Sequence, residues 1–264
     1  MSGDFENKVV IVTGGCGGIG SAIVRKFLSA GAKVLMTDSA EQKLSEVFSD
    51  MKKDFGGKVA SFVADMREAY AVAPRVVDFT LKNLGEVDIL VNCAGIYPSK
   101  IALDITEEDW DKTYDLNVKG YFFMAQAAAK SMVQHKKKGC LINITSTASE
   151  VARPGVAHYC SSKAAVKMMT QVLALEWAQY GIRVNAFGPG LVETETLMAT
   201  LITDKAKAEH KEKVTFIPLG RSGAAEEMAE AVAFLASDDA CYITGQSLFA
   251  DGGYAAGRTY QSMK

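Results

Sequence analysis

Residues 8–20 read KVVIVTGGCGGIG, and this stretch decides the expected fold. Its first six residues are mostly β-branched, which favours a strand. The glycines that follow allow a tight turn, and residues 19–30 then carry apolar side chains at helical spacing. A helix that begins directly after such a turn presents free backbone N–H groups, which bind phosphate. The stretch therefore predicts a strand, a phosphate-binding turn and a helix.

The alternation of short apolar strands and longer helices continues along the chain. Strands that are apolar on both faces belong to a parallel sheet covered by helices. The pattern predicts an α/β fold with one Rossmann-type, doubly wound domain over residues 1–264, a seven-stranded parallel sheet and helices on both faces. We expect strands at 8–13, 34–37, 59–63, 87–92, 140–145, 182–187 and 247–250, and helices at 19–30, 41–55, 67–84, 110–134, 157–180 and 224–236.

Two segments depart from this regular pattern. Pro74 falls inside the expected helix at 67–84, so the first turns of that helix should be irregular. Residues 193–214 have a helical but polar pattern, which predicts a flexible flap.

Composition excludes several classes of protein. The net charge is −2 and the isoelectric point about 6.0, which predicts no nucleic-acid partner. No apolar run approaches the roughly 18 residues of a membrane helix, and the polar N-terminus lacks the features of a signal peptide. The five cysteines form no CxxC pair and the three histidines are scattered. We therefore expect reduced thiols, a cytoplasmic protein and no metal site.

Asp38 closes the second expected strand, beyond the glycine turn. A carboxylate at this place can accept hydrogen bonds from the ribose hydroxyls of NAD and repel the 2′-phosphate of NADP. The alternative role is that of a solvated loop residue. In the context of the glycine turn, Asp38 predicts NAD as the cofactor.

Further motifs follow at distances that span almost the whole chain. They are TGGCGGIG at 13–20, NCAG at 92–95, DLNV at 115–118, Ser146 after NIT, YCSSK at 159–163, PGLVET at 189–194 and DGG at 251–253. In these motifs and their order, residues 8–254 resemble the classical short-chain dehydrogenase/reductase family. Cys93 stands where that family usually has asparagine, and Cys16 puts a thiol inside the turn.

The resemblance implies an NAD(H)-dependent oxidoreductase that interconverts a secondary alcohol and a ketone. It implies that Tyr159 transfers the proton and that Lys163 also binds the nicotinamide ribose. It further implies that Asn117 holds a water molecule linking Lys163 to solvent. The cofactor contacts that it implies are Gly14, Gly18, Ile19, Gly20, Asp38, Asp65, Met66, Asn92, Ala94, Gly95, Tyr159, Lys163, Pro189, Gly190, Val192 and Thr194. Asp65 could also act as the N-cap of the helix that follows it.

The residue types suit this chemistry. Tyr159 and Lys163 are four residues apart on an expected helix and share a face. A free tyrosine has a pKa of roughly 10, too high for a base near neutrality, and a nearby ammonium should lower that pKa. Ser146 can orient the substrate oxygen and stabilise charge on it. Taken alone, a YxxxK pattern would more often be a core aromatic and a surface lysine.

The substrate and the exact activity stay open. Candidate substrate contacts are Ser146, Tyr159, Tyr97, Glu150 and Glu193, whose mixture with apolar residues suits a polyol, a sugar, a cyclic alcohol or a 3-oxoacyl compound. A non-catalytic NAD(H)-binding redox sensor is the main alternative, although it would not need the proton relay. A sugar-nucleotide epimerase or dehydratase of the extended branch usually has a larger C-terminal substrate region.

Small and apolar residues are abundant in the expected helices at 110–134 and 157–180. One face of each helix should pack on the sheet, and the excess suggests a subunit interface. The family resemblance implies a homotetramer with two-fold axes built on these helices. The alternative is ordinary packing within one subunit.

Overall fold

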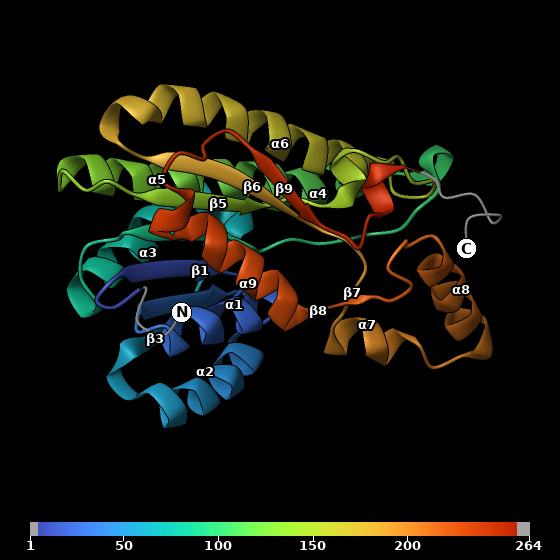
Figure 1. Cartoon of the computed structure of the whole chain (residues 1–264), viewed down its shortest axis with the longest axis horizontal. Coiled ribbons are helices and arrows are strands. Elements are labelled where there is room, and N and C mark those ends of the chain that lie inside the picture. The colour runs from blue at the N-terminus through green and yellow to red at the C-terminus, as the bar shows by residue number, and fades with distance from the viewer. Residues whose placement is uncertain (1–4, 258–264) are drawn as a thin grey trace.

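The computed structural model describes residues 5–257, apart from the side chains of Thr196 and Thr200 (Figure 1). Within that range a seven-stranded sheet has the order β3-β2-β1-β4-β5-β6-β9, and every neighbouring pair is parallel. The predicted seven-stranded parallel sheet is thereby confirmed. The strands are β1 (Val9–Thr13), β2 (Lys33–Asp38), β3 (Val59–Val63), β4 (Ile89–Asn92), β5 (Cys140–Ile144), β6 (Arg183–Pro189) and β9 (Ser247–Ala250).

Successive residues of β1 point to opposite faces of the sheet, and both faces are covered. Val10 and Val12 pack in a core with the helices Gly18–Ser29, Glu41–Phe55 and Ala225–Ala236, whereas Val9 and Ile11 pack in a second core with the helices Ala69–Asn83, Tyr121–Gln134 and Ala157–Trp177. This alternation follows from the two-residue period of a strand. It explains why the β-branched run has no polar side. The helices are α1 (Gly18–Ser29), α2 (Glu41–Phe55), α3 (Ala69–Asn83), α4 (Glu107–Tyr114), α5 (Tyr121–Gln134), α6 (Ala157–Trp177) and α9 (Ala225–Ala236).

The predicted long helix at 110–134 is wrong in two respects. It begins earlier, at Glu107, where the Thr106 side chain accepts from the Asp109 backbone and completes a capping box. It is also divided, because Asp115–Gly120 forms a π-helical turn between α4 and α5. Such turns are frequent at functional sites, and this one carries Asn117. The spacing of apolar residues predicts which face of a helix is covered. It does not predict a local change from α-helical to π-helical winding.

The irregular start predicted for the helix containing Pro74 is confirmed. A 3-10 turn at Met66–Glu68 precedes α3, and Pro74 lies inside that helix. The predicted flap contains two separate helices, α7 (Glu195–Thr200) and α8 (Asp204–Thr215). Figure 1 shows these two helices together, to one side of the main sheet. They lie between β7 (Val192–Glu193) and β8 (Gly223–Ala224), which pair with each other.

The chain order places a topological switch point at the carboxyl ends of β1 and β4. From β1 the chain moves outward through β2 to β3, and it then crosses back to β4 on the other side of β1. Ligands of doubly wound sheets bind at such a switch point. The side chains that end these strands therefore decide the chemistry. Among residues 5–257, no helix is long and apolar enough to cross a membrane.

Candidate functional site

The glycine turn after β1 is held against the end of β4. The Thr13 hydroxyl oxygen accepts from the backbone N–H groups of Cys93 and Ala94, at 3.0 and 3.1 Å. Gly14 has φ +67°, and a Cβ there would lie 2.8 Å from the Ala94 backbone. Both the conformation and the close approach require glycine.

The start of α1 fits the pyrophosphate of a dinucleotide. Its N-cap, Gly17, makes no side-chain capping bond, and no acidic residue lies in the first turn. The backbone N–H groups of that turn and the positive end of the helix are therefore available for an anion. A Cβ on Gly18 would lie 2.6 Å from Thr194 Cβ, and one on Gly20 would meet the Gly14 oxygen. Ile19 between them packs on the core.

Asp38 lies at the end of β2, beside the turn. Its side chain is half-buried and accepts from the Ala40 backbone at 3.2 Å. Burial, together with hydrogen bonding to Asp38 and its charge, raises the pKa of the Cys16 thiol to about 12. Cys16 is therefore a neutral thiol at physiological pH. Asp38 is positioned at the strand end, as the ribose role requires.

Asp65 acts as the N-cap of the 3-10 turn, the second role that its position allowed. It accepts from the Arg67 backbone at 2.9 Å and pairs with the Arg67 guanidinium, which lowers the pKa of Asp65. Met66, which follows it, is buried. A contact of Asp65 or Met66 with adenine stays a prediction.

The Asn92 side chain links three elements of the fold. Its amide donates to the Tyr121 backbone oxygen at 3.1 Å and to Asn143 Oδ1 at 3.0 Å. The amide nitrogen of Asn92 is thus engaged within the protein, and the predicted ribose contact stays a prediction. Gly95 keeps the next position open, since a Cβ there would lie 3.2 Å from Asn117 Oδ1 and 3.6 Å from Lys163 Nζ. The NCAG motif therefore borders the catalytic candidates.

Asn117 projects from the π-helical turn and is fully buried. Its side chain binds both backbone groups of Ile96 at 3.0 Å, and its amide also donates to Ser162 Oγ at 3.2 Å. It thereby fixes the chain that follows β4 against α6. The water-holding role implied by the resemblance stays a prediction.

Lys163 is buried, with 4% of its surface exposed. Its Nζ donates to the Ile144 backbone oxygen at 2.9 Å and to the Tyr121 hydroxyl at 3.4 Å. Burial lowers the pKa of Lys163 to about 8, because an ammonium is poorly solvated there. Lys163 Nζ also lies 5.9 Å from the centroid of the Tyr159 ring. The structure therefore brings the predicted pair together.

The expected effect of Lys163 on Tyr159 is not what the structure shows. Burial raises the pKa of Tyr159, opposed by a hydrogen bond with Ser146 and by the charge of Arg153. Lys163 is not among the groups that shift this pKa. The reason is that the pKa of Lys163 is lowered to about 8, so Lys163 has lost its charge before Tyr159, whose pKa is raised, releases its proton. Ser146 is buried, and its Oγ also accepts from the Ala148 backbone at 3.1 Å.

Of the remaining substrate candidates, the structure brings Tyr97 to Tyr159. The two rings meet edge to face, with centroids 4.6 Å apart. Glu150 instead forms an ion pair with Lys167, and it lines a cleft with Gln171, Ser247 and Asp251. Glu193 is exposed on β7 and lines another cleft beside α1. Neither Ser146 nor Tyr159 lines these two clefts. The structure therefore does not bring Glu150 or Glu193 into a common cleft with the two catalytic candidates.

The PGLVET segment lies beside the phosphate turn. Pro189 ends β6, and the Gly190 backbone donates to the Ala250 oxygen at 3.0 Å. Val192 is buried, and Thr194 accepts from the Leu197 backbone as the N-cap of α7. The close approach of Thr194 to Gly18 brings two segments that are far apart in sequence to one crevice.

Sequence reasoning missed two residues of this site. Tyr121 is four residues after Asn117, so helical spacing could have indicated that it lies on the same side. Arg153 lies in the loop before α6, where no periodic pattern applies. Its terminal nitrogen donates to Thr147 Oγ1 at 2.6 Å, and its guanidinium carbon lies 5.2 Å from the Tyr254 ring centroid.

Comparisons with known proteins agree with this arrangement. Residues 14–255 match the family model described as enoyl-(acyl carrier protein) reductase. The 3-oxoacyl-(acyl-carrier-protein) reductase FabG of Rickettsia typhi is 38% identical over 95% of this chain and 98% of its own length.

Solved structures show the same fold. A short-chain dehydrogenase/reductase from Brucella melitensis, described as a glucose/ribitol dehydrogenase, has a TM-score of 0.88 at 31% identity and covers 96% of this chain and 99% of its own. A putative gluconate dehydrogenase from Agrobacterium tumefaciens has a TM-score of 0.88 at 29% identity, with coverages of 97% and 100%. The chain belongs to the classical short-chain dehydrogenase/reductase family.

Proposed function

We propose that this protein is an NAD(H)-dependent dehydrogenase/reductase that interconverts a secondary alcohol and a ketone. The observation that carries the proposal is the position of buried Lys163, whose Nζ lies 5.9 Å from the centroid of the Tyr159 ring, with the buried Ser146 hydroxyl acting on the same phenol. A phenol that shares a polar contact with a hydroxyl at a strand end is placed to exchange a proton with a substrate oxygen.

The residues divide the chemistry between them. In oxidation, Tyr159 takes the proton of the substrate hydroxyl, and in reduction it returns that proton to the carbonyl oxygen. Ser146 orients the same oxygen and stabilises the charge that develops on it. A nicotinamide cofactor held here would supply the hydride exchange at the substrate carbon. Asn117 and Lys163 stabilise the buried side of the site. Asn117 donates to the Ile96 backbone oxygen, and Lys163 donates to the Ile144 backbone oxygen.

The cofactor would lie along the carboxyl ends of the strands. The turn from Gly14 to Gly20 would hold the pyrophosphate, and Asp38 the adenosine ribose. Asp65, Met66 and the main chain of 92–95 would border the adenosine. Lys163 and Tyr159 would bind the nicotinamide ribose, and Pro189, Gly190, Val192 and Thr194 would hold the nicotinamide end. The half-buried carboxylate of Asp38 supports NAD rather than NADP.

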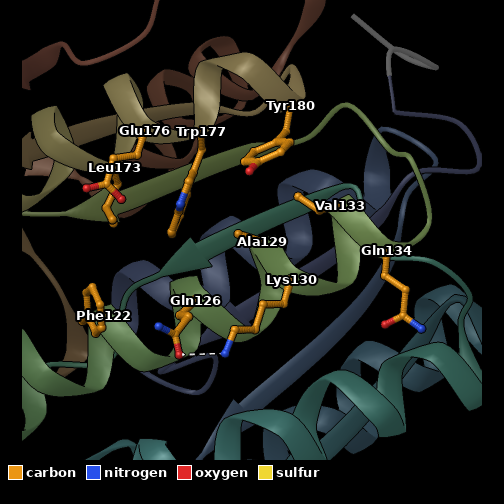
Figure 2. Close-up of a pocket in the computed structure, with 10 residues that line it drawn as sticks. All are labelled: Phe122, Gln126, Ala129, Lys130, Val133, Gln134, Leu173, Glu176, Trp177 and Tyr180. Carbon is orange, nitrogen blue, oxygen red and sulfur yellow. Dashed lines mark hydrogen bonds between the residues drawn. The ribbon is translucent and has the colours of Figure 1, made fainter.

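We also propose assembly through α5 and α6, in a cytoplasmic homotetramer. A groove of about 420 Å³ lies between these helices, and Figure 2 shows Leu173 and Trp177 of α6 facing Ala129 of α5. Beyond the groove, Met168, Val172 and Leu175 of α6 are 60%, 45% and 83% exposed. A row of exposed apolar side chains on one helix supports a surface covered by a second subunit.

A panel of polyols, sugars, cyclic alcohols and 3-oxoacyl thioesters, assayed with NAD⁺ and NADH, tests the activity. We expect turnover of at least one secondary alcohol or ketone, and a decrease of about 10²–10⁴-fold in kcat for Tyr159→Phe. Cofactor binding, measured by titration, should persist in that variant. Near wild-type kcat in Tyr159→Phe would remove this tyrosine from the mechanism. NADH binding without turnover of any compound would favour the redox-sensor alternative.

A further inference from the structure

Arg153 is a half-buried cation with few partners. Its guanidinium donates to Thr147 Oγ1 and stacks on the Tyr254 ring, while its Nε is buried and has no hydrogen-bond partner within the described residues. Within residues 5–257, no carboxylate lies within ion-pair distance of it. A guanidinium has five N–H donors in a planar fork. Most of the donors of Arg153 are therefore left for another group.

Other arginines of the chain show how unusual this is. Arg67 and Arg221 pair with Asp65 and Glu227. Arg183, which is also half-buried, donates to four backbone oxygens near the end of α9. A partly buried charge without such partners lowers stability. An external anion would supply the hydrogen-bond acceptors that Arg153 does not find within the described residues.

The position of Arg153 is at the reacting end of the site. Thr147, which it contacts, directly follows Ser146, and the charge of Arg153 acts on Tyr159. Lys167, the neighbouring cation on α6, is already paired with Glu150. Lys163, the other cation near Tyr159, is buried and donates to the Ile144 backbone oxygen and the Tyr121 hydroxyl. The cation with donors left for a substrate is therefore the Arg153 guanidinium. One guanidinium fork matches one carboxylate, by two parallel N–H···O bonds.

We infer that Arg153 binds a carboxylate of the substrate, so that this enzyme acts on hydroxy acids and oxo acids in preference to neutral alcohols and ketones. The inference rests on the proposed alcohol–ketone activity and adds its substrate class. In this arrangement Ser146 and Tyr159 hold the reacting oxygen, and Arg153 holds the acid group at the other end of a short chain.

The test compares acids with neutral partners that carry a hydroxymethyl group in place of the carboxylate. Suitable pairs are gluconate with sorbitol and 3-hydroxybutyrate with 1,3-butanediol, each with NAD⁺. We expect kcat/KM for at least one acid to exceed that of its partner by about tenfold or more. Arg153→Gln should reduce this ratio by about 10–100-fold, mainly through KM for the acid, and Arg153→Lys should reduce it less. Arg75→Gln is the matched control, because Arg75 is an exposed residue of α3 whose guanidinium lies over the ring of Phe62.

Calorimetry with the full chain and saturating NADH separates the inference from the activity on which it rests. If no alcohol is oxidised but an acid binds more tightly than its neutral partner, and Arg153→Gln abolishes the difference, the carboxylate site stands and the proposed reaction fails. If the neutral compounds react or bind as well as the acids in the wild type, the inference is overturned. This comparison uses the wild-type protein alone and does not depend on whether a variant folds. An equal loss of the ratio in Arg75→Gln would also overturn it.

Discussion

Lys163 Nζ lies 3.4 Å from the Tyr121 hydroxyl oxygen and 4.9 Å from the centroid of the Tyr121 ring. The same hydroxyl donates to the Ile144 backbone oxygen at 3.1 Å, which Lys163 also contacts. Burial holds the pKa of Tyr121 well above its usual range, so its hydroxyl stays protonated. A second, fully buried tyrosine therefore supports the lysine beside Tyr159.

Replacing Tyr121 with Phe tests this support. The variant keeps the ring but removes an acceptor of the lysine ammonium, so the pKa of Lys163 should fall below its wild-type value of about 8. The free energy of unfolding should fall by about 1–3 kcal/mol, because the hydroxyl loses two hydrogen bonds, one donated to Ile144 and one accepted from Lys163. Labelled-lysine NMR titration reports the pKa, and urea unfolding reports the stability. Tyr70→Phe, at an exposed residue of α3, is the control and should change neither the Lys163 pKa nor the stability. An unchanged Lys163 pKa in Tyr121→Phe would show that the Tyr121 hydroxyl does not stabilise the lysine ammonium.

The lowered pKa of Lys163 predicts a stability that rises with pH. The folded protein releases the Lys163 proton near pH 8, whereas the unfolded chain holds it to about 10.5, the ordinary value. Between these values the unfolded state binds more protons, so the free energy of unfolding increases with pH. Relative to Lys163→Met, the wild type should gain up to roughly 3 kcal/mol from pH 7 to pH 11. Urea unfolding of both proteins across this range measures the difference, and a flat difference would mean that Lys163 titrates normally.

Asp38 predicts the choice of cofactor. Two like charges about 4 Å apart repel by roughly 1 kcal/mol in water, and each lost ribose bond to a charged group adds about 1.5–3 kcal/mol. We therefore expect kcat/KM with NAD(H) to exceed that with NADP(H) by at least about a hundredfold. Asp38→Ser with Ser39→Arg should reverse the preference, because it replaces the repelling carboxylate by a cation. Equal efficiency with both cofactors in the wild type would show that Asp38 does not contact the ribose.

The exposed row on α6 predicts the assembly. Leu175→Glu would place a charge in the proposed interface, where it would lose solvation without a partner. We expect a tetramer for the wild type at micromolar concentration and a smaller species for this variant, both measured by sedimentation. Leu103→Glu, at a 95% exposed residue of the 3-10 turn Ala102–Asp104 before α4, is the control that should remain tetrameric. A monomeric wild type would contradict the proposed interface.

The sequence by itself determined the strands, most helices and the order of the motifs. The run KVVIVT and the glycines behind it specify local conformations, since side-chain branching and a positive φ act within a few residues. The spacing of Tyr159 and Lys163 likewise places them on one helical face before any packing is known.

The tertiary structure decided which groups those side chains meet. Tyr121 supports Lys163, Asn92 binds Asn143, Glu150 pairs with Lys167, and the π-helical turn directs Asn117 to Ile96. Arg153 and Tyr254 are about a hundred residues apart in the chain and meet only in the folded protein. Contacts of this kind depend on how whole elements pack. Local periodicity therefore does not predict which residue a side chain contacts in another element.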